Sequence, residues 1–277
     1  MKINYHICFS KEKAPELIDL LYRNDVPFQS SGHMLTTDIS DTSPHWKTIR
    51  AIVESKQLTC LPETSFTKRE LSNAEWLCVR SKWRNGYPQP ESKFGYQTIT
   101  YDSTQYCESC GSGLRQQSAF RFKSSPKWGN RHFMMVNWVN DELFVDRYVK
   151  GILETNRISG ISFTQVHNKD GSAVLPDVFQ LSVEEESPIG LLEEQASIQG
   201  VDNCIYCGCK KFHPSGIGKY AVQKAVFASM PDICKSAEIL GWGKSAHRLI
   251  FVRHSVYRVI TENNLDRGLV FSPVDLV

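Results

Sequence analysis

Two short stretches of the sequence pair cysteines at the spacing that metal-binding turns use. Cys107 and Cys110 lie in CESCGSG, and Cys204 and Cys207 lie in CIYCGCKKFH, so each pair has two intervening residues and a following glycine. Two thiolates at this spacing can reach one ion from a single tight turn, and structural zinc takes four ligands in a tetrahedron. The glycine suits the point where the turn reverses, because it tolerates backbone conformations that other residues avoid.

The ligand set can be completed in two ways. The second pair has Cys209 and His213 close by, whereas the first pair has no third ligand near it in the sequence. Paired cysteines of zinc ribbons are usually separated by about 15 to 20 residues, so the long segment 111–203 must fold to bring the two pairs together. We expect one structural zinc site shared by Cys107, Cys110, Cys204 and Cys207, because it satisfies both pairs.

Composition is that of an ordinary globular protein. The chain has 277 residues, a net charge of +2 and 22% charged residues, with no apolar run as long as a membrane span. The charges at 11–13 interrupt the N-terminal apolar residues, so we expect no secretory signal and a cytoplasmic location. In a reducing compartment the nine cysteines remain thiols, and we expect the isolated ones, Cys8, Cys60, Cys78 and Cys234, to be small buried side chains.

No catalytic motif accompanies these cysteines. GWGKSAH at 241–247 resembles a phosphate-binding loop, but residue 238 is Glu238 where that motif requires glycine. No Gly-x-Ser-x-Gly elbow and no His-Glu-x-x-His helix occurs. We therefore expect a protein that is not an enzyme; a distant Cys-His pair is the alternative that one sequence leaves open.

The first part of the chain predicts a small α+β unit over 1–95. INYHICF at 3–9 is typical of a strand, and apolar residues at helical spacing predict helices over 14–23 and 43–56. A further helix is predicted over 67–81, where Thr67 and Glu70 have the spacing of a capping box. Asn-Gly and two prolines at 85–92 then indicate a boundary.

The remainder contains a weak internal repeat. Residues 144–166 and 251–274 align with one inserted residue, and each copy predicts a strand, an amphipathic helix, a glycine turn and another strand. The matched pairs are Phe144 with Phe251, Val145 with Val252, Gly160 with Gly268, Phe163 with Phe271 and Val166 with Val274. Each copy follows its own Cys-x-x-Cys-Gly. We therefore predict an α+β fold with two repeat units, at 96–170 and 171–277.

Charge is uneven along the second half of the chain. VEEESPIGLLEEQ is acidic and contains Glu184, Glu185, Glu186, Glu193 and Glu194, whereas Arg248, Arg253, Arg258 and Arg267 make the last thirty residues basic. The acidic segment is a candidate surface for a basic partner. The basic helix around Arg253 and Arg258 suggests the alternative of a zinc-ribbon-like module that binds nucleic acid, although the small net charge argues against nucleic acid as the main partner.

Several segments carry a family resemblance, which covers about 85–277. GYPQP (86–90), YCESCGSGLRQQSAFRFK (106–123), NWVNDELFVDRYV (137–149), ISGISFTQV (158–166) and the ending GLVFSPVDLV resemble the double-Cys-x-x-Cys-Gly proteins of bacteria. The C-terminal helix-Gly-Phe-x-Pro-Val segment is also similar to immunity-protein families of bacterial polymorphic-toxin systems. TQV at 164–166 departs from the Phe-x-Pro-Val ending of the second copy.

The resemblance implies a cytoplasmic protein that binds a cognate toxin and blocks its active site. Within it, Cys107, Cys110, Cys204 and Cys207 would be the metal ligands. Residues that touch a toxin differ between such relatives and are not transferred. We expect a monomer or a dimer that has the toxin as its partner and no membrane contact.

Overall fold

The computed structural model describes residues 1–277, and the chain divides into two compact units. The first unit comprises Met1–Glu70 with the short segment Ser215–Gly218, and the second comprises Leu71–Pro214 with Lys219–Val277. This division differs from the predicted boundaries at 95 and 170. Both predicted repeats, 96–170 and 171–277, lie in the second unit except for the short segment Ser215–Gly218.

The first unit is a four-stranded antiparallel sheet with two helices. Its elements follow the order β1 (Lys2–Ser10), α1 (Pro15–Arg23), β2 (Phe28–Ser31), β3 (Met34–Ser40), α2 (Trp46–Ser55) and β4 (Thr59–Ser65). The strand order β2-β3-β1-β4 with this sequence of elements is the split βαβ arrangement of ferredoxin-like units. Leu17 and Leu21 of α1 and Ile49 and Val53 of α2 bury their side chains in one core with the sheet. The predicted strand at 3–9 and both helices are confirmed.

The predicted helix over 67–81 is wrong beyond its first turn. The capping box forms as expected, since the Thr67 amide donates to Glu70 Oε2 at 2.8 Å and the Glu70 amide donates to Thr67 Oγ1 at 3.2 Å. However, α3 spans only Lys68–Ser72, and β5 (Trp76–Ser81) follows it. All residues of β5 except Arg80 are buried, and an apolar run of this length fits a central strand as well as a helix.

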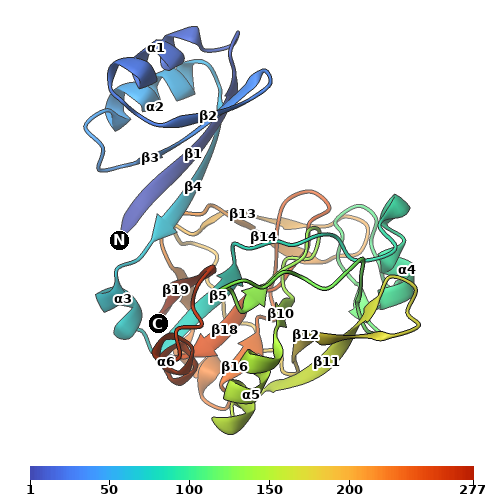
Figure 1. Ribbon diagram of the computed structural model, residues 1–277. Helices are drawn as coiled ribbons and strands as arrows, with labels where there is room; N and C mark the ends of the chain where they lie inside the picture. The colour runs from blue at the N-terminus through green and yellow to red at the C-terminus, as the bar shows by residue number, and fades with distance from the viewer. The chain divides into compact units, whose positions relative to one another are not determined.

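Two five-stranded sheets form the framework of the second unit (Figure 1). The first sheet has the order β8-β11-β12-β10-β9, and the second has the order β15-β19-β5-β18-β16. The strands of the first sheet are β8 (Arg121–Phe122), β9 (Phe133–Met134), β10 (Leu143–Val145), β11 (Ile161–Asn168) and β12 (Val174–Val183). Those of the second, besides β5, are β15 (Tyr220–Val222), β16 (Ile233–Lys235), β18 (Ile250–Arg253) and β19 (Leu269–Leu276).

Strand directions correspond position by position in the two sheets. In each, the central strand is antiparallel to both neighbours, one edge strand is antiparallel and the other is parallel. The helix α5 (Arg147–Thr155) joins β10 to β11, and α6 (His254–Glu262) joins β18 to β19. Gly160 and Gly268 precede the last strand of each copy, at φ values of 84° and 87°. We call residues 82–168, from the end of β5 to the end of β11, the first copy, and residues 184–276, from the end of β12 to the end of β19, the second copy.

The central strands are exchanged between the copies. Along the chain, β5 precedes the first cysteine pair and β12 precedes the second, yet β5 lies between β18 and β19, and β12 lies between β10 and β11. Each copy therefore completes its sheet with the strand that precedes the other. For this reason the two copies form one compact unit.

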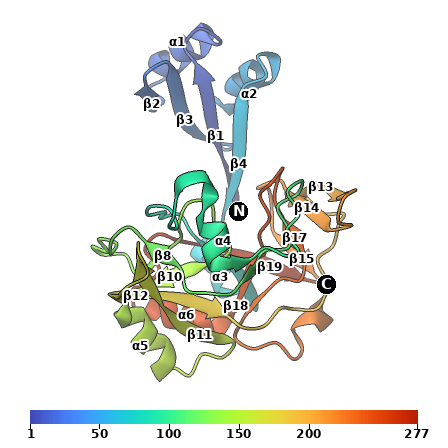
Figure 2. The ribbon, with the colours of Figure 1, turned by 90° about the vertical axis from the view of Figure 1, so that its right-hand side faces the viewer.

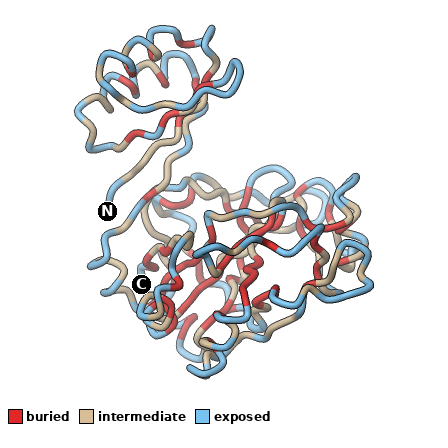
Figure 3. Tube along the Cα trace, viewed as in Figure 1, coloured by how far each residue is buried: buried red, intermediate tan, exposed pale blue.

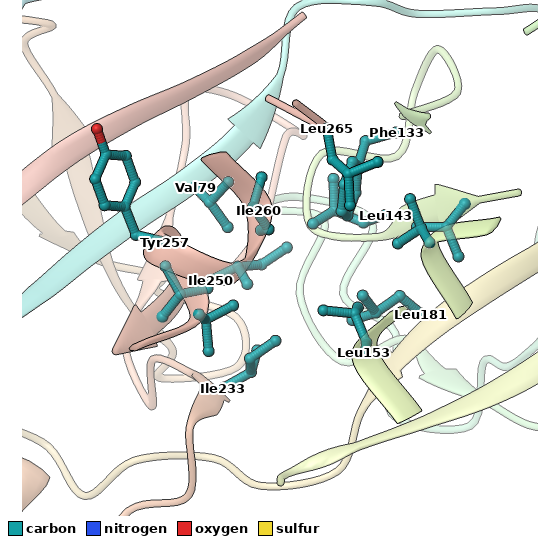
Figure 4. Close-up of a cluster of buried hydrophobic side chains, with 14 of the residues drawn as sticks. Val79, Phe133, Leu143, Leu153, Leu181, Ile233, Ile250, Tyr257, Ile260 and Leu265 are labelled. Carbon is teal, nitrogen blue, oxygen red and sulfur yellow. The ribbon is translucent and has the colours of Figure 1, made fainter. Parts of the chain in front are cut away.

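One hydrophobic core joins the two sheets. Figure 4 shows Phe133, Leu143, Leu153 and Leu181 from the first sheet and its helix lying in the same cluster as residues of the second. The second sheet and α6 contribute Val79, Ile233, Ile250, Tyr257, Ile260 and others. Buried stretches of the trace coincide with these strands (Figure 3), and α5 and α6 lie on the same side of the second unit in both ribbon views (Figure 2).

The remaining elements surround the cysteine pairs or connect the sheets. They are η1 (Ser92–Phe94), α4 (Tyr96–Thr100), β6 (Tyr101–Asp102), β7 (Arg115–Gln116), β13 (Ile198–Asn203), β14 (Lys210–Pro214), η2 (Lys224–Phe227) and β17 (Ile239–Leu240). The first cysteine pair lies between the paired strands β6 and β7, and the second lies between β13 and β14. None of the helices has both the length and the apolar character needed to span a bilayer.

Candidate metal centre

Each cysteine pair lies in a turn with the same hydrogen bonds. In the first turn, the Gly111 amide donates to the Cys107 carbonyl at 2.8 Å, and the Cys107 amide donates to the Ser112 carbonyl at 2.8 Å. In the second turn, the Gly208 amide donates to the Cys204 carbonyl at 2.8 Å, and the Cys204 amide donates to the Cys209 carbonyl at 2.9 Å. We call these turns the first and second knuckle.

The glycine of each knuckle has the left-handed conformation that the sequence predicts. Gly111 has a φ of 79° and Gly208 has a φ of 73°, a region that costs other residues about 1 to 2 kcal/mol. The sequence signal and the backbone geometry therefore agree in both turns.

The fold brings the four cysteine sulfurs to one place. The sulfur atoms of Cys107, Cys110, Cys204 and Cys207 all lie within 4.8 Å of one another. Cys107 Sγ is 3.7 Å from Cys204 Sγ, and Cys110 Sγ is 3.6 Å from Cys207 Sγ. In a tetrahedron with Zn–S bonds of about 2.3 Å the sulfurs are about 3.8 Å apart. The four side chains therefore fit one metal ion shared by the two knuckles.

The second turn favours a thiolate at Cys204, and the thiolate is the form of cysteine that binds metal. The backbone N–H groups of Cys207 and Tyr206 lower the pKa of Cys204 to about 6. The Cys110 amide lowers the pKa of Cys107, but burial and neighbouring thiols outweigh it and hold that pKa at about 11. Thiols this close together cannot all ionise without mutual repulsion between the thiolates. A divalent cation bound among them would neutralise that repulsion and release the remaining protons.

A buried lysine lies beside the cysteine cluster. Lys211 is 4% exposed, and its ammonium donates to the carbonyl of Cys110 at 2.8 Å and to the carbonyl of Gly243. It forms no ion pair with a carboxylate. Buried ammonium groups need a compensating charge, and a divalent ion held by four thiolates carries a net charge of about −2. Lys211 therefore fits a metal-bound cluster in electrostatics as well as in geometry.

Cys209 and His213 are not part of the cluster. The Cys209 thiol contacts the carbonyl of Lys210 at 3.6 Å, and His213 Nε2 is 3.3 Å from Asp202 Oδ2 with its ring against Trp242. The alternative in which the second pair completes its own site is therefore not the arrangement that the fold adopts. Of the isolated cysteines, Cys78 and Cys234 are buried as expected, whereas Cys8 and Cys60 are partly exposed.

The first knuckle packs closely against the loop between β17 and β18 in the second copy. A Cβ atom on Gly111 would lie 2.0 Å from the carbonyl oxygen of Lys244, so only glycine permits this approach. A Cβ atom on Gly208 would meet nothing within 4 Å. The centre thus has one packed turn and one exposed turn, and four protein ligands leave no position for a substrate.

The predicted partner surface is exposed but only partly free of counter-charges. All five glutamates of the acidic segment are exposed. Glu186 pairs with Arg248 at 3.1 Å, and Glu193 pairs with Lys210. Glu184, Glu185 and Glu194 form no ion pair, and Ile189 between them in sequence is 80% exposed.

The two arginines around the start of α6 both have contacts within the protein. The Arg253 guanidinium lies 4.8 Å from the centre of the Trp76 ring and donates to the Met230 carbonyl at 2.6 Å. Arg258 pairs with Glu262 at 3.0 Å. These contacts occupy the two residues on which the nucleic-acid alternative depends.

Sequence reasoning did not find Lys211. Its signal is local, because Lys211 is the second lysine of the CKK run after the second pair, but the same letters fit a solvated strand. Only the fold shows that this side chain lies inside.

No protein-family model matches the chain, and no curated protein matches it either.

Proposed function

We propose that the protein is a zinc-stabilised immunity protein that binds and occludes a cognate bacterial toxin. The observation that carries this proposal is the exposed acidic segment around Ile189, combined with a closed metal centre that has no open position for chemistry. The resemblance of 85–277 to immunity-protein families supports the same function. The protein would act by stoichiometric binding and not by catalysis.

Zinc is the metal that we propose for the centre. Four thiolates in a tetrahedral arrangement suit zinc, and a closed site of this kind contributes to folding. Metal analysis of the purified protein tests this, with Cys204→Ser in parallel and Cys209→Ser as the matched control. One zinc per chain in the parent and the control, and none in Cys204→Ser, is the expected result. A parent protein without zinc contradicts the proposal.

The acidic segment would meet a basic surface of the toxin. Glu184 and Glu185 carry charges that no neighbouring cation neutralises, so they remain available to a partner. Ile189, which is 80% exposed and lies between the glutamates of the acidic segment in the sequence, would supply apolar contact area in the same region. Charge complementarity would mainly accelerate association.

Co-purification with the product of the neighbouring gene tests the immunity function directly. Once that partner is purified, the kinetics of its association at low salt are measured with the double variant Glu184→Lys and Glu185→Lys. We expect association about tenfold slower than in the parent. Asp266→Lys, at another exposed and unpaired acidic residue, is the control. Equal association rates for the parent and the double variant remove the acidic segment as the binding surface.

A further inference from the structure

An open cleft lies next to the first knuckle. It has a volume of about 690 Å³, within the range of about 300 to 1,000 Å³ that small-molecule sites occupy. The loop after β5, the segment between β9 and β10, Gly111 of the first knuckle and the turn 244–246 form its walls. The cleft belongs entirely to the second unit and is separate from the acidic segment.

Aromatic rings dominate one side of the cleft. The Trp138 ring centre lies 4.4 Å from that of Tyr87 and 4.5 Å from that of Phe94, and the rings are tilted by 51° in both pairs. These side chains are 40%, 37% and 49% exposed, respectively. Large rings that stay accessible beside a cavity offer a stacking surface for another planar group.

Two of these aromatic residues have unfavourable backbone conformations. Trp138 has a φ of 71° and Phe94 has a φ of 56°, in the left-handed region that bulky residues avoid. Lys93, next to Phe94, has a φ of 51°. Such conformations persist where the surrounding structure enforces them, and they cluster at ligand sites. The rings are therefore fixed in place at the expense of local backbone energy.

The charged groups of the cleft are both positive. Arg84 and Lys244 line it, no Asp or Glu does, and neither cation forms an ion pair. Arg84 is oriented by bonds to the carbonyl of Val136 at 3.0 Å and to Asn140 Oδ1 at 2.8 Å, which leave other N–H groups free. Aromatic rings alone can bind a cation, but two neighbouring cations would repel it. This cleft favours an anion.

The corresponding region of the second copy has a different loop contact. An isolated parallel β-bridge pairs Arg84 with Met135 in the first copy, and another pairs Glu186 with Lys235 in the second. Met135 therefore corresponds to Lys235, and Trp138 corresponds to Glu238, because each follows its bridge residue by three positions. Glu238 is buried and accepts hydrogen bonds from the amides of Gly190 at 2.6 Å and Leu191 at 2.7 Å. The carboxylate thus holds its loop closed. In the first copy, Trp138 replaces this closing contact with an exposed ring.

We propose that the cleft is a binding site for a small ligand in which a planar aromatic ring is joined to an anionic group. The ring would stack on Trp138 and Tyr87, and the anion would lie at Lys244 and Arg84. A nucleoside monophosphate and an aromatic carboxylate both have this chemistry. Asn137 donates its amide N–H to the Gly86 carbonyl at 2.9 Å and keeps its oxygen free, which suits the amino group of a base.

Calorimetry with the zinc-loaded full chain tests the site. The probes are AMP, GMP, CMP and UMP for nucleotides and 4-hydroxybenzoate for aromatic carboxylates. Binding of a nucleotide or of the aromatic carboxylate supports a site for a ring joined to an anion. The probe class that binds more tightly identifies the class of the natural ligand. Adenosine, inorganic phosphate and choline are the comparison compounds, and each should bind at least about tenfold more weakly because it lacks the ring or the anion, or carries the wrong charge.

Variants locate the binding in this cleft. Trp138→Gly removes the ring and suits the left-handed backbone, so the chain should fold while ring–anion ligands bind about tenfold more weakly. Lys244→Gln should weaken binding similarly and reduce its salt dependence. Tyr148→Ala and Lys169→Gln, at exposed positions elsewhere in the second unit, should leave binding unchanged. The proposal is overturned by no binding of any ring–anion probe at millimolar concentration, by binding that both cleft variants leave intact, or by a comparison compound that binds as well.

Discussion

The first and second copies share their framework and differ in their loops. Each copy supplies four strands of a five-stranded sheet in the same arrangement, a nine-residue helix in the same place and a knuckle with the same hydrogen bonds. Beside this framework, the first copy has exposed rings and the unpaired Arg84, whereas the second has a buried carboxylate that closes its loop. The charges are reversed as well, because Arg84 corresponds to Glu186.

This difference assigns stability to the shared elements and binding surfaces to the loops. The shared elements, which include the metal centre and the core, hold the unit together. The loops, which packing constrains less, are free to acquire different surfaces. The acidic surface of the second copy and the aromatic cleft formed mainly by the first would allow two separate binding events on one protein.

The largest expected effect comes from cysteine substitutions in the two knuckles. If the knuckles share one ion, Cys107→Ser and Cys204→Ser each lose it, and each destabilises the second unit by about 5 kcal/mol or more. The double variant should then cost little more than either single change, because the ion is already lost. Urea unfolding and metal content measure both quantities. Additive losses in the double variant would instead indicate two independent sites.

A buried ion pair gives the next largest effect. Lys235 Nζ lies 2.5 Å from Glu142 Oε1, and both side chains are about nine-tenths buried. The counterpart of Lys235 in the first copy is Met135, and the counterpart of Glu142 in the second copy is Leu249; both are apolar. We expect Lys235→Met alone to cost about 3 to 5 kcal/mol, because it leaves Glu142 without its cation.

The matching double variant sharpens this test. Lys235→Met with Glu142→Leu gives each position the residue type of its counterpart, so the free energy of unfolding should return to within about 2 kcal/mol of the parent. Gln180, which donates to Glu142 Oε2 at 2.9 Å, loses one partner and accounts for part of the remainder. A double variant as unstable as Lys235→Met would show that the ion pair is not the cause.

Alanine substitutions at the two knuckle glycines should have the smallest effects on the free energy of unfolding, and they allow the two turns to be compared directly. Gly208→Ala should cost about 1 kcal/mol, the strain of a left-handed alanine in open space. Gly111→Ala should cost about 3 kcal/mol, because its Cβ also collides with the Lys244 carbonyl. Thermal unfolding of the two variants measures the difference. Equal losses would mean that the turn 241–246 moves away readily, which would also widen the cleft.

Local signals in the sequence predicted local structure well. The four cysteines, the glycines after them and the helices at 14–23 and 43–56 depend on residues close together in the chain, and all are found as predicted. The α+β class follows from the same signals.

Features that depend on distant residues were not predictable. Nothing within WLCVRS distinguishes a buried helix from a central strand, and its strand partners lie at 250–253 and 269–276. The cleft was missed because NGYPQP indicates only a turn, and no pattern marks Trp138 for a left-handed conformation. Pairing and strain of this kind arise from the whole fold.

The exchange of β5 and β12 has a consequence for how the protein is made. During synthesis, β5 emerges long before β18 and β19, so its backbone N–H and C=O groups and its apolar side chains lack their partners until those two strands follow. Contacts of such sequence separation slow folding, and a waiting strand is prone to wrong pairing. The nascent second unit should therefore depend on chaperones until its final strand leaves the ribosome.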